Sequence, residues 1–193
     1  MKLDSHALTV IDALLAEEIP FLVVGSYSSN VYGIPRSTKD ADLVIELRDK
    51  SVLSLNKHLP QSFHLDPQLR IETATGTTRN VISIDGTAFL IELFRLSQDS
   101  HDQERFHRRI KATVEGRDVW IPTAEDVVIT KLRWAYHLAR SKDIDDVRNV
   151  LALRQTRLDW DYLHRWTLEH GTEKLLAEVM MDVPPPEALN ELS

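Results

Sequence analysis

The sequence predicts an α+β fold in which interleaved helices and strands precede a helical bundle. Apolar residues recur at both strand and helix spacing up to Pro122, whereas only helical spacing follows it. Two turn-forming pairs, Asp85-Gly86 and Glu115-Gly116, separate strand-like runs in the first part. The 193 residues are 42% hydrophobic and 27% charged, which is sufficient for a buried core.

The change of pattern at Pro122 also predicts the domain organisation. We expect an α/β core over residues 1–122 and a C-terminal helical domain over residues 123–183. A run of prolines follows Val183, and such runs end regular structure. Residues 184–193 are therefore expected to form a flexible tail.

The first part is expected to begin with a helix over residues 4–18, capped by Asp4 or Ser5 and carrying one apolar stripe. A short buried strand should follow Pro20, and a helix from Ser26 should end near Gly33. The remaining expected elements are strands at 41–47, near 70–75, 79–84, 88–96, 112–114 and 119–121, with helices at 51–59 and 103–110.

The second part is expected to contain only helices. Thr123 can cap the first of them, and Asp126, three residues later, gives a weaker form of the capping box. Gly171 is placed to stop the third helix. The expected helices run over residues 123–140, 143–153, 159–170 and 172–182.

Composition limits the function classes. The chain has no cysteine, which excludes disulfides and thiolate metal sites. The net charge of −7 argues against a protein that coats nucleic acid nonspecifically, although a local basic groove remains compatible with it. The first residues do not resemble a signal peptide, and no apolar run approaches the length of a membrane span. We therefore expect a cytoplasmic protein without a membrane partner.

Two carboxylates one residue apart are the strongest chemical signal. Asp40 and Asp42 lie at the start of an expected strand, and residues i and i+2 of a strand face the same side. Their side chains should project together, roughly 6–7 Å apart along the backbone. Magnesium prefers oxygen ligands and often shares them between protein carboxylates and substrate phosphates. The pair therefore predicts a metal site for phosphoryl or nucleotidyl transfer.

A third carboxylate is expected from a neighbouring strand, and Glu92 is the candidate. Glu92 lies in an apolar run, where burying an acid is costly unless a metal or another charge compensates it. The alternatives are that Glu92 faces solvent or pairs with an arginine.

Gly25 and Ser26 are expected where a strand turns into a helix. Backbone N–H groups at a helix start can hold phosphate oxygens, and glycine permits a close approach of the backbone. An ordinary turn, with Ser26 as the helix cap, is the alternative. Together with the two carboxylates downstream, the pair indicates a nucleotide site.

At this point the chain resembles the DNA polymerase β-like nucleotidyltransferase superfamily, whose pattern is Gly-Ser, a spacer, and an acid-apolar-acid triplet. Within it, the chain is similar to the AbiEii-type abortive-infection toxins. Residues 33–42 read Gly-Ile-Pro-Arg-Ser-Thr-Lys-Asp-Ala-Asp, and residues 140–146 read Arg-Ser-Lys-Asp-Ile-Asp-Asp, both similar to patterns of that group. A third supporting run begins at Ile121 and continues to Lys131. The resemblance covers about residues 5–153.

The resemblance implies a minimal nucleotidyltransferase fold, a mixed β-sheet flanked by helices, followed by the helical domain. It implies that Asp40 and Asp42 bind metal, and that Lys131 and Asp146, with Asp143 less strongly indicated, help to bind the nucleotide. The chain departs from the family pattern at Glu92, where aspartate is usual. Read without the family, Lys131 could instead extend to solvent from a mostly apolar helix.

Basic residues near the carboxylates complete the expected site. Arg36 and Lys39 directly precede Asp40 and are expected to contact nucleotide or to balance the acids. A second basic concentration is expected either to hold triphosphate or RNA backbone or to form a solvated helix face. Its members are Arg95, Arg105, Arg108, Arg109, Lys111 and Arg117.

The sequence thus predicts a nucleotidyltransferase that uses Mg²⁺ (or Mn²⁺) to move a nucleoside monophosphate from an NTP to an acceptor hydroxyl. By resemblance, the acceptor is an RNA 3′ end such as that of tRNA, in a toxin–antitoxin or phage-defence setting with a cognate antitoxin as partner. A protein side chain or a small aminoglycoside-like molecule is the alternative acceptor. The rival hypothesis is a catalytically weak protein that keeps the fold and binds a nucleotide or a partner.

Overall fold

The computed structural model describes residues 3–72 and 76–185. Contacts group the chain into two compact units. Unit 1 consists of Met1–Tyr27 and Ser37–Pro122, and unit 2 consists of Ser28–Arg36 and Thr123–Ser193. The segment Ser28–Arg36 therefore belongs with the C-terminal helices although it precedes most of the sheet in sequence. The division into two domains at Pro122 stays a prediction. Residues 186–193 of the expected tail lie outside the described residues.

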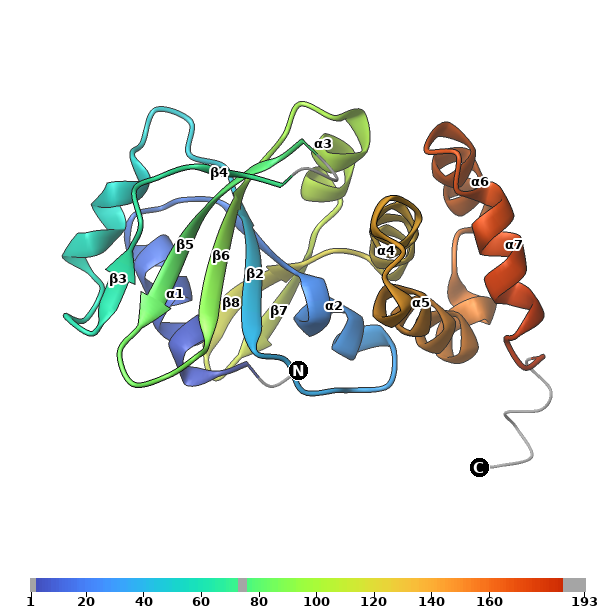
Figure 1. The fold of residues 1–193 in the computed structure, drawn as a ribbon, viewed down its shortest axis with the longest axis horizontal. Coiled ribbons are helices and arrows are strands. Elements are labelled where there is room, and N and C mark those ends of the chain that lie inside the picture. The colour runs from blue at the N-terminus through green and yellow to red at the C-terminus, as the bar shows by residue number, and fades with distance from the viewer. Residues whose placement is uncertain (1–2, 73–75, 186–193) are drawn as a thin grey trace. The chain divides into compact units, whose positions relative to one another are not determined.

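The centre of unit 1 is a six-stranded mixed sheet (Figure 1). Its strands β2 and β6 run parallel, and all the other neighbouring pairs are antiparallel. This confirms the expected mixed sheet with helices. In spatial order the strands are β1 (Phe21–Val24), β2 (Asp40–Ile45), β6 (Leu90–Arg95), β5 (Thr78–Ile84) and β3 (Phe63–Leu65), with β4 (Arg70–Ile71) also paired to β5.

The alternation of side chains gives the sheet a buried face. Ala41, Leu43 and Ile45 of β2 are each about 1% exposed, and Ile91 and Leu93 of β6 are fully buried. These five residues lie on one face because β2 and β6 pair in register, residue by residue. Burying this apolar surface is the main force that holds the sheet in its register. The acidic residues of the same strands must then project from the opposite face.

A second, two-stranded sheet in unit 1 is formed by β7 (Ile110–Val114) and β8 (Arg117–Ile121). The two-residue turn between them has positive φ at Glu115 (49°) and at Gly116 (78°), as type I′ hairpins require. Trp120 of β8 packs edge-on against Phe21 of β1, with ring centroids 5.4 Å apart. The expected hairpin is confirmed.

Two helices lead the chain into the sheet. α1 (Ser5–Ala16) is capped by Asp4, whose carboxylate accepts a hydrogen bond from the His6 amide at 2.9 Å. α2 (Gly25–Tyr32) follows β1 without an intervening loop. The first three residues of α2 belong to unit 1 and the remainder to unit 2.

The elements of unit 1 differ from the expectations in several details. The helix expected at 51–59 is a short 3₁₀ helix, η1 (Val52–Lys57), because Pro60 leaves too few residues to repay α-helix nucleation. The strand β3 was not expected, since three residues carry almost no periodic signal. Of the strand expected near 70–75, only the two residues of β4 are paired, and residues 73–75 lie outside the described residues.

The helix expected at 103–110 instead begins earlier, as α3 (Ser100–His107). Asp99 is the physical reason, because its carboxylate caps the helix by accepting from the amides of His101 and Asp102, both at 3.1 Å. Ile110 leaves the helix and pairs with Ile121 in the hairpin.

Unit 2 contains the four helices expected from the sequence: α4 (Ala124–Leu138), α5 (Ser141–Arg154), α6 (Trp160–Glu169) and α7 (Glu173–Met181), with a short 3₁₀ turn η2 (Gln155–Arg157). Thr123 caps α4 through the Asp126 amide, and the Tyr162 hydroxyl of α6 donates to the Asp126 carboxylate at 2.7 Å. The buried core contributed by the four helices and the α5–α6 turn consists of Val127, Val128, Ile129, Leu132, Val147, Val150, Leu151, Leu158, Tyr162, Leu163, Trp166, Leu176 and Val179.

Within the described ranges, no helix is both long and apolar enough to cross a membrane.

Candidate functional site

The sheet of unit 1 brings three carboxylates to one face. Asp40 and Asp42 alternate with the buried residues of β2, so both project from the face opposite the core. Asp42 pairs with Glu92 across the parallel β2–β6 ladder, which places Glu92 on that same face. The structure thus places the three acids predicted from the sequence on one face of adjacent strands, with Asp42 and Glu92 in direct register and Asp40 two residues before Asp42.

Gly25 lies directly beneath the Asp42 carboxylate. A Cβ atom built on Gly25 would fall 2.0 Å from Oδ2 of Asp42, so the Asp42 carboxylate would have to move to admit any side chain here. Gly25 also has a φ of +64°, a conformation that L side chains rarely adopt. Two independent features therefore favour glycine here, and its backbone and the Asp42 carboxylate lie close together at the start of α2.

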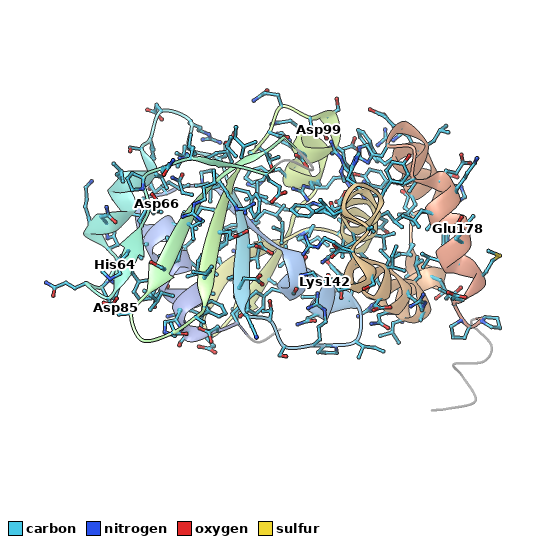
Figure 2. The ribbon with its side chains drawn as sticks, viewed as in Figure 1. His64, Asp66, Asp85, Asp99, Lys142 and Glu178 are labelled. Carbon is cyan, nitrogen blue, oxygen red and sulfur yellow. The ribbon has the colours of Figure 1, made fainter. Side chains whose placement is uncertain are left out.

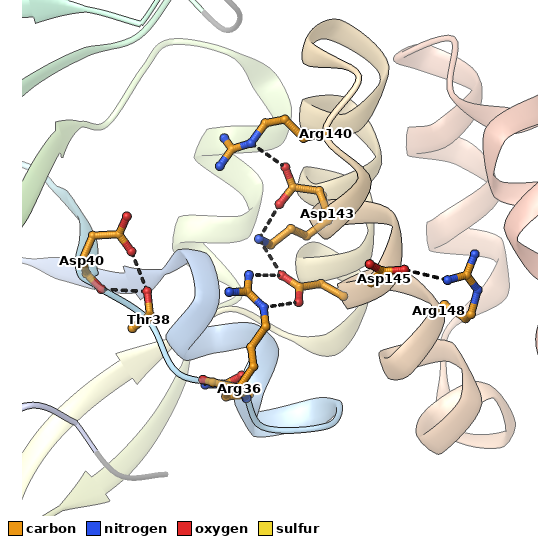
Figure 3. Close-up of polar contacts among 10 residues, drawn as sticks. Arg36, Thr38, Asp40, Arg140, Asp143, Asp145 and Arg148 are labelled. Atoms are coloured by element: carbon orange, nitrogen blue, oxygen red, sulfur yellow. Dashed lines mark hydrogen bonds and ion pairs between the residues drawn. The ribbon is translucent and has the colours of Figure 1, made fainter.

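Asp40 and Glu92 each have a polar partner. The Thr38 hydroxyl donates to Oδ1 of Asp40 at 2.6 Å (Figure 3). Glu92 forms an ion pair with Arg79 of β5, with Oε1 and Nε 3.3 Å apart, and Arg79 also contacts Glu72. Pairing of Glu92 with an arginine was one of the alternatives left open by the sequence, and the structure shows this pairing. The sequence did not identify Arg79 as the partner, which the antiparallel β5–β6 pairing places near Glu92.

The surroundings of Glu92 shift its acidity. Burial raises the pKa of the Glu92 carboxyl, Arg79 acts to lower it, and the negative charges of Asp40 and Glu72 raise it further. The net pKa lies above the ordinary value of 4.5. Mutual repulsion among closely spaced carboxylates is the electrostatic condition that a divalent cation relieves.

The other residues predicted near the acids occupy different environments. Ser26 is the second residue of α2 and is buried, whereas Lys39 is exposed immediately before β2. The Leu90 amide donates to the Lys39 carbonyl at 3.3 Å, which extends the β2–β6 pairing by one step.

Arg36, Lys131 and Asp146 form a buried ion network in unit 2 (Figure 3). The Arg36 guanidinium binds the Asp146 carboxylate through two nitrogens, at 2.8 and 2.9 Å. The Lys131 ammonium lies 2.8 Å from the same carboxylate. The Asp146 side chain is only 3% exposed. Both of its oxygens are therefore occupied by cations of the protein, and Asp146 holds Arg36 and Lys131 in place.

Asp143 and Arg140 extend this network by one more pair. Lys131 donates to Asp143 at 2.7 Å, and Nε of Arg140 lies 3.2 Å from the other Asp143 oxygen. The network therefore contains three cations and two carboxylates, which leaves one net positive charge. Arg140 and Asp143 both lie in the run 140–146 that supported the family resemblance. The sequence did not predict that these two residues pair, because a spacing of three residues does not show which charged side chains meet.

Arg36 is fixed through its backbone as well as its side chain. The Asn30 side chain accepts from the Arg36 amide at 3.0 Å and donates to the Arg36 carbonyl at 2.7 Å. Burial acts to raise the pKa of Asp146, but the hydrogen bond from Arg36 and the charge of Lys131 outweigh it and hold the pKa below its ordinary value of 3.8.

Much of the basic concentration after β6 is paired within the protein. Arg117 binds Asp12 through two nitrogens at 2.7 and 2.9 Å, and Lys111 lies 2.8 Å from Asp118. Arg95 donates to the Asn80 side chain at 2.8 Å. These three contacts favour the structural interpretation of those residues over binding of a phosphate backbone.

The carboxylate face fits a divalent cation by its donor set. Three carboxylates offer the hard oxygen ligands that Mg²⁺ and Mn²⁺ prefer, and they lie on one face of two adjacent strands. The absence of a Cβ at Gly25 leaves the Asp42 carboxylate room beside a helix start. Arg79 supplies positive charge on the same side of the sheet, with its Nε 3.3 Å from Oε1 of Glu92.

The family model described as "Nucleotidyltransferase of unknown function (DUF6036)" matches residues 1–182. No curated protein sequence matches the chain significantly.

Solved structures resemble the chain in fold. The antibiotic-resistance factor ANT(2″)-Ia, in a crystal structure of its complex with adenylyl-2″-tobramycin, has a TM-score of 0.60 at 12% identity, covering 88% of this chain and 97% of its own. An antigenic nucleotidyltransferase-like protein from Paracoccidioides brasiliensis has a TM-score of 0.53 at 17% identity, covering 95% of this chain and 96% of its own. At these identities the likeness shows the fold, which agrees with the mixed sheet and helices described above.

Proposed function

Because this chain belongs to the nucleotidyltransferase family DUF6036, we propose that it transfers a nucleoside monophosphate from an NTP to an acceptor hydroxyl with a bound divalent cation. The observation that carries the proposal is the placement of Asp40, Asp42 and Glu92 on one face of the sheet, beside a glycine whose missing Cβ leaves room for the Asp42 carboxylate. The AbiEii-type resemblance remains a finer proposal within this family.

Asp40, Asp42 and Glu92 are the residues that would hold Mg²⁺ or Mn²⁺. When bound, such a cation neutralises charge on the phosphates and lowers the pKa of a coordinated hydroxyl. Asp42 is the central ligand of the set, because it pairs with Glu92 and faces Gly25. Glu92 has a second candidate role as the base, since burial raises the pKa of its carboxyl and a more basic carboxylate accepts a proton more readily.

The proposed reaction is an in-line displacement at the α-phosphorus. The acceptor oxygen forms a bond to that phosphorus, the bond to the β-phosphate oxygen breaks, and pyrophosphate leaves. The acceptor proton passes to Glu92 or to solvent. The protein supplies positioning and charge, which are the main contributions that enzymes make to this class of reaction.

The nucleotide phosphates are assigned to backbone amides and cations. The start of α2, at Gly25 and Ser26, offers N–H groups of the kind that hold phosphate oxygens. Arg36, Lys39 and Lys131 are the proposed cationic contacts. Asp146 serves in this proposal by fixing Arg36 and Lys131, because its own oxygens are already engaged.

The leading proposed acceptor is an RNA 3′ end, in a toxin–antitoxin or phage-defence setting. A small polycationic acceptor is the second candidate, and two observations favour it. The net charge of −7 attracts cations, and the fold resembles ANT(2″)-Ia, whose structure holds a nucleotidylated aminoglycoside. A catalytically weak protein that binds a nucleotide or a partner is the rival to both.

The acceptor can be identified with the whole protein. Wild type and an Asp40→Ala/Asp42→Ala variant are incubated with Mg²⁺, each labelled NTP and a cell extract, and in parallel with an aminoglycoside. Label that only the wild type transfers, and that nuclease removes, establishes the RNA acceptor; protease-sensitive label or a labelled aminoglycoside establishes the alternatives. No transfer with any acceptor, together with no Mg²⁺-dependent NTP binding, supports the weak-catalyst hypothesis.

A further inference from the structure

The last turns of α4 and the junction to α5 combine positive charge with aromatic side chains. No aspartate or glutamate occurs between Asp126 and Asp143, in a chain whose net charge is −7. Six residues of this stretch define what we call the α4 exit surface: Arg133, Trp134, Tyr136, His137, Arg140 and Lys142. The charge of this surface is thus opposite in sign to that of the molecule as a whole.

Helical spacing places Arg133 and His137, four residues apart, on one side of α4, with Trp134 and Tyr136 flanking them to either side. Leu132 and Ala135 are the last buried residues of α4, and Tyr136 lies one turn after Leu132, where the buried stripe ends. Tyr136 is 60% exposed, and His137 is also exposed. A large aromatic ring left this open on a helix is a candidate for contact with a partner.

The aromatic rings and the cations of this surface are interleaved. The Arg140 guanidinium lies over the Trp134 ring, 5.2 Å from its centroid, and Figure 3 shows its Nε turned toward Asp143. The Tyr136 and His137 rings meet edge to face, with centroids 5.5 Å apart. Lys142, labelled in Figure 2, is exposed in the first turn of α5.

We propose that the α4 exit surface binds single-stranded RNA, with Tyr136 and Trp134 stacking on bases and Arg140 and Lys142 contacting phosphates. Flat aromatic faces beside cations suit a flexible chain that carries both bases and negative charge. A polycationic small molecule would be repelled by the same cations. This inference rests on the proposed function only in identifying the RNA as the acceptor; the binding itself requires neither nucleotide nor metal.

The test measures binding of a short single-stranded RNA oligonucleotide, labelled at its 5′ end, to the full chain by fluorescence anisotropy across a series of salt concentrations. Tyr136→Ala should raise the Kd about 5- to 100-fold, as expected for the loss of one stacked base. Tyr136→Phe keeps the ring and should bind as the wild type does. Lys142→Gln should lower the slope of log K against log salt by about 0.7, as expected for the loss of one phosphate contact to a single strand.

Matched controls lie on other helices of the same unit. Lys174→Gln removes an exposed lysine from α7, and Leu168→Ala removes a side chain that is 66% exposed on α6. Both should leave RNA affinity unchanged. Wild-type affinity in Tyr136→Ala and Lys142→Gln, or no saturable binding of RNA by the wild type, would overturn the proposal.

The outcome is separable from that of the proposed function. RNA binding that persists in a protein unable to transfer nucleotide counts against the transferase proposal alone. Transfer to a small molecule or a protein by a chain that does not bind RNA counts against the RNA surface alone.

Discussion

At the scale of single residues, Gly25 and Asp42 are the most tightly constrained pair of the candidate site. The backbone of Gly25 has a positive φ and approaches the Asp42 carboxylate so closely that even a methyl group would displace it. The carboxylate position is thus set by the absence of a side chain beneath it. A metal site needs ligand oxygens placed to within a few tenths of an ångström, so this contact bears directly on activity.

Gly25→Ala should therefore abolish nucleotidyl transfer by pushing Asp42 away from its position. The backbone strain alone should cost about 1–2 kcal/mol of folding free energy. Initial transfer rates and thermal unfolding measure the two effects. Gly86→Ala is the matched control, because Gly86 has a similar φ of +75° but nothing within 4 Å of an added Cβ. Gly86→Ala should lose stability but keep its transfer rate; wild-type transfer in Gly25→Ala would show that the close approach is not needed.

At the scale of elements, the α4–α5 hairpin is held together by buried ions. Lys131 on α4 bridges Asp143 and Asp146 on α5, and Arg36 adds a two-point contact to Asp146. Buried carboxylates lose their hydration and must be compensated by nearby cations, so removing one member leaves the others uncompensated. The neighbouring Asp145 pairs with Arg148 at the surface. One turn of α5 thus contains a buried ion pair at Asp146 and an exposed one at Asp145.

Asp146→Asn should lower the free energy of unfolding by about 3 kcal/mol, the cost typical of breaking a buried pair. Asp145→Asn is the control and should cost less than 1 kcal/mol, since the Asp145 side chain is 63% exposed. Urea unfolding at neutral pH measures both. Equal losses for the two variants would contradict the inferred role of Asp146 as the buried anchor.

The Asp146 anchor also predicts the direction of a pH effect. Because the folded-state pKa of Asp146 is lowered below its ordinary value of 3.8, its contribution to stability is present above that pH and is lost as the pH falls through the folded-state pKa. The stability gap between wild type and Asp146→Asn should be constant near neutral pH and shrink below about pH 4. A gap that widens in acid would contradict this assignment.

The sequence was most informative where local chemistry determines the outcome. The Thr123 cap, the Glu115-Gly116 turn and the alternation around Asp40 and Asp42 are each readable within a few residues, and the structure agrees with each. Arg79 beside Glu92 and Arg36 on Asp146 were not predicted as pairs, since both contacts depend on tertiary pairing. The Arg36–Asp146 contact joins residues 110 positions apart, for which a single sequence provides no spacing rule.

At the scale of the whole molecule, the chain has an acidic net charge, a carboxylate face in unit 1 and a cationic network in unit 2. The first set suits a divalent cation, and the second has one net positive charge suited to an anion. A metal–NTP complex contains both kinds of group.

Mg²⁺ with an NTP should therefore raise the melting temperature more than either alone. At a ligand concentration 100 times Kd, the linkage gain is about 2.7 kcal/mol. Differential scanning fluorimetry measures the shift, and removing the metal with a chelator should reverse it. The Asp40→Ala/Asp42→Ala variant should show no shift dependent on Mg²⁺. An unchanged shift in that variant would place the metal elsewhere.

The measurement that tests the central claim most directly compares two labels on one NTP. Wild type is incubated with Mg²⁺, a cell extract and an NTP labelled at either the α- or the γ-phosphate, beside the Asp40→Ala/Asp42→Ala variant. Nucleotidyl transfer at these carboxylates predicts that the acceptor gains the α-label and never the γ-label, and that the variant transfers neither. Transfer of the γ-label, or of the α-label by the variant, would contradict the account.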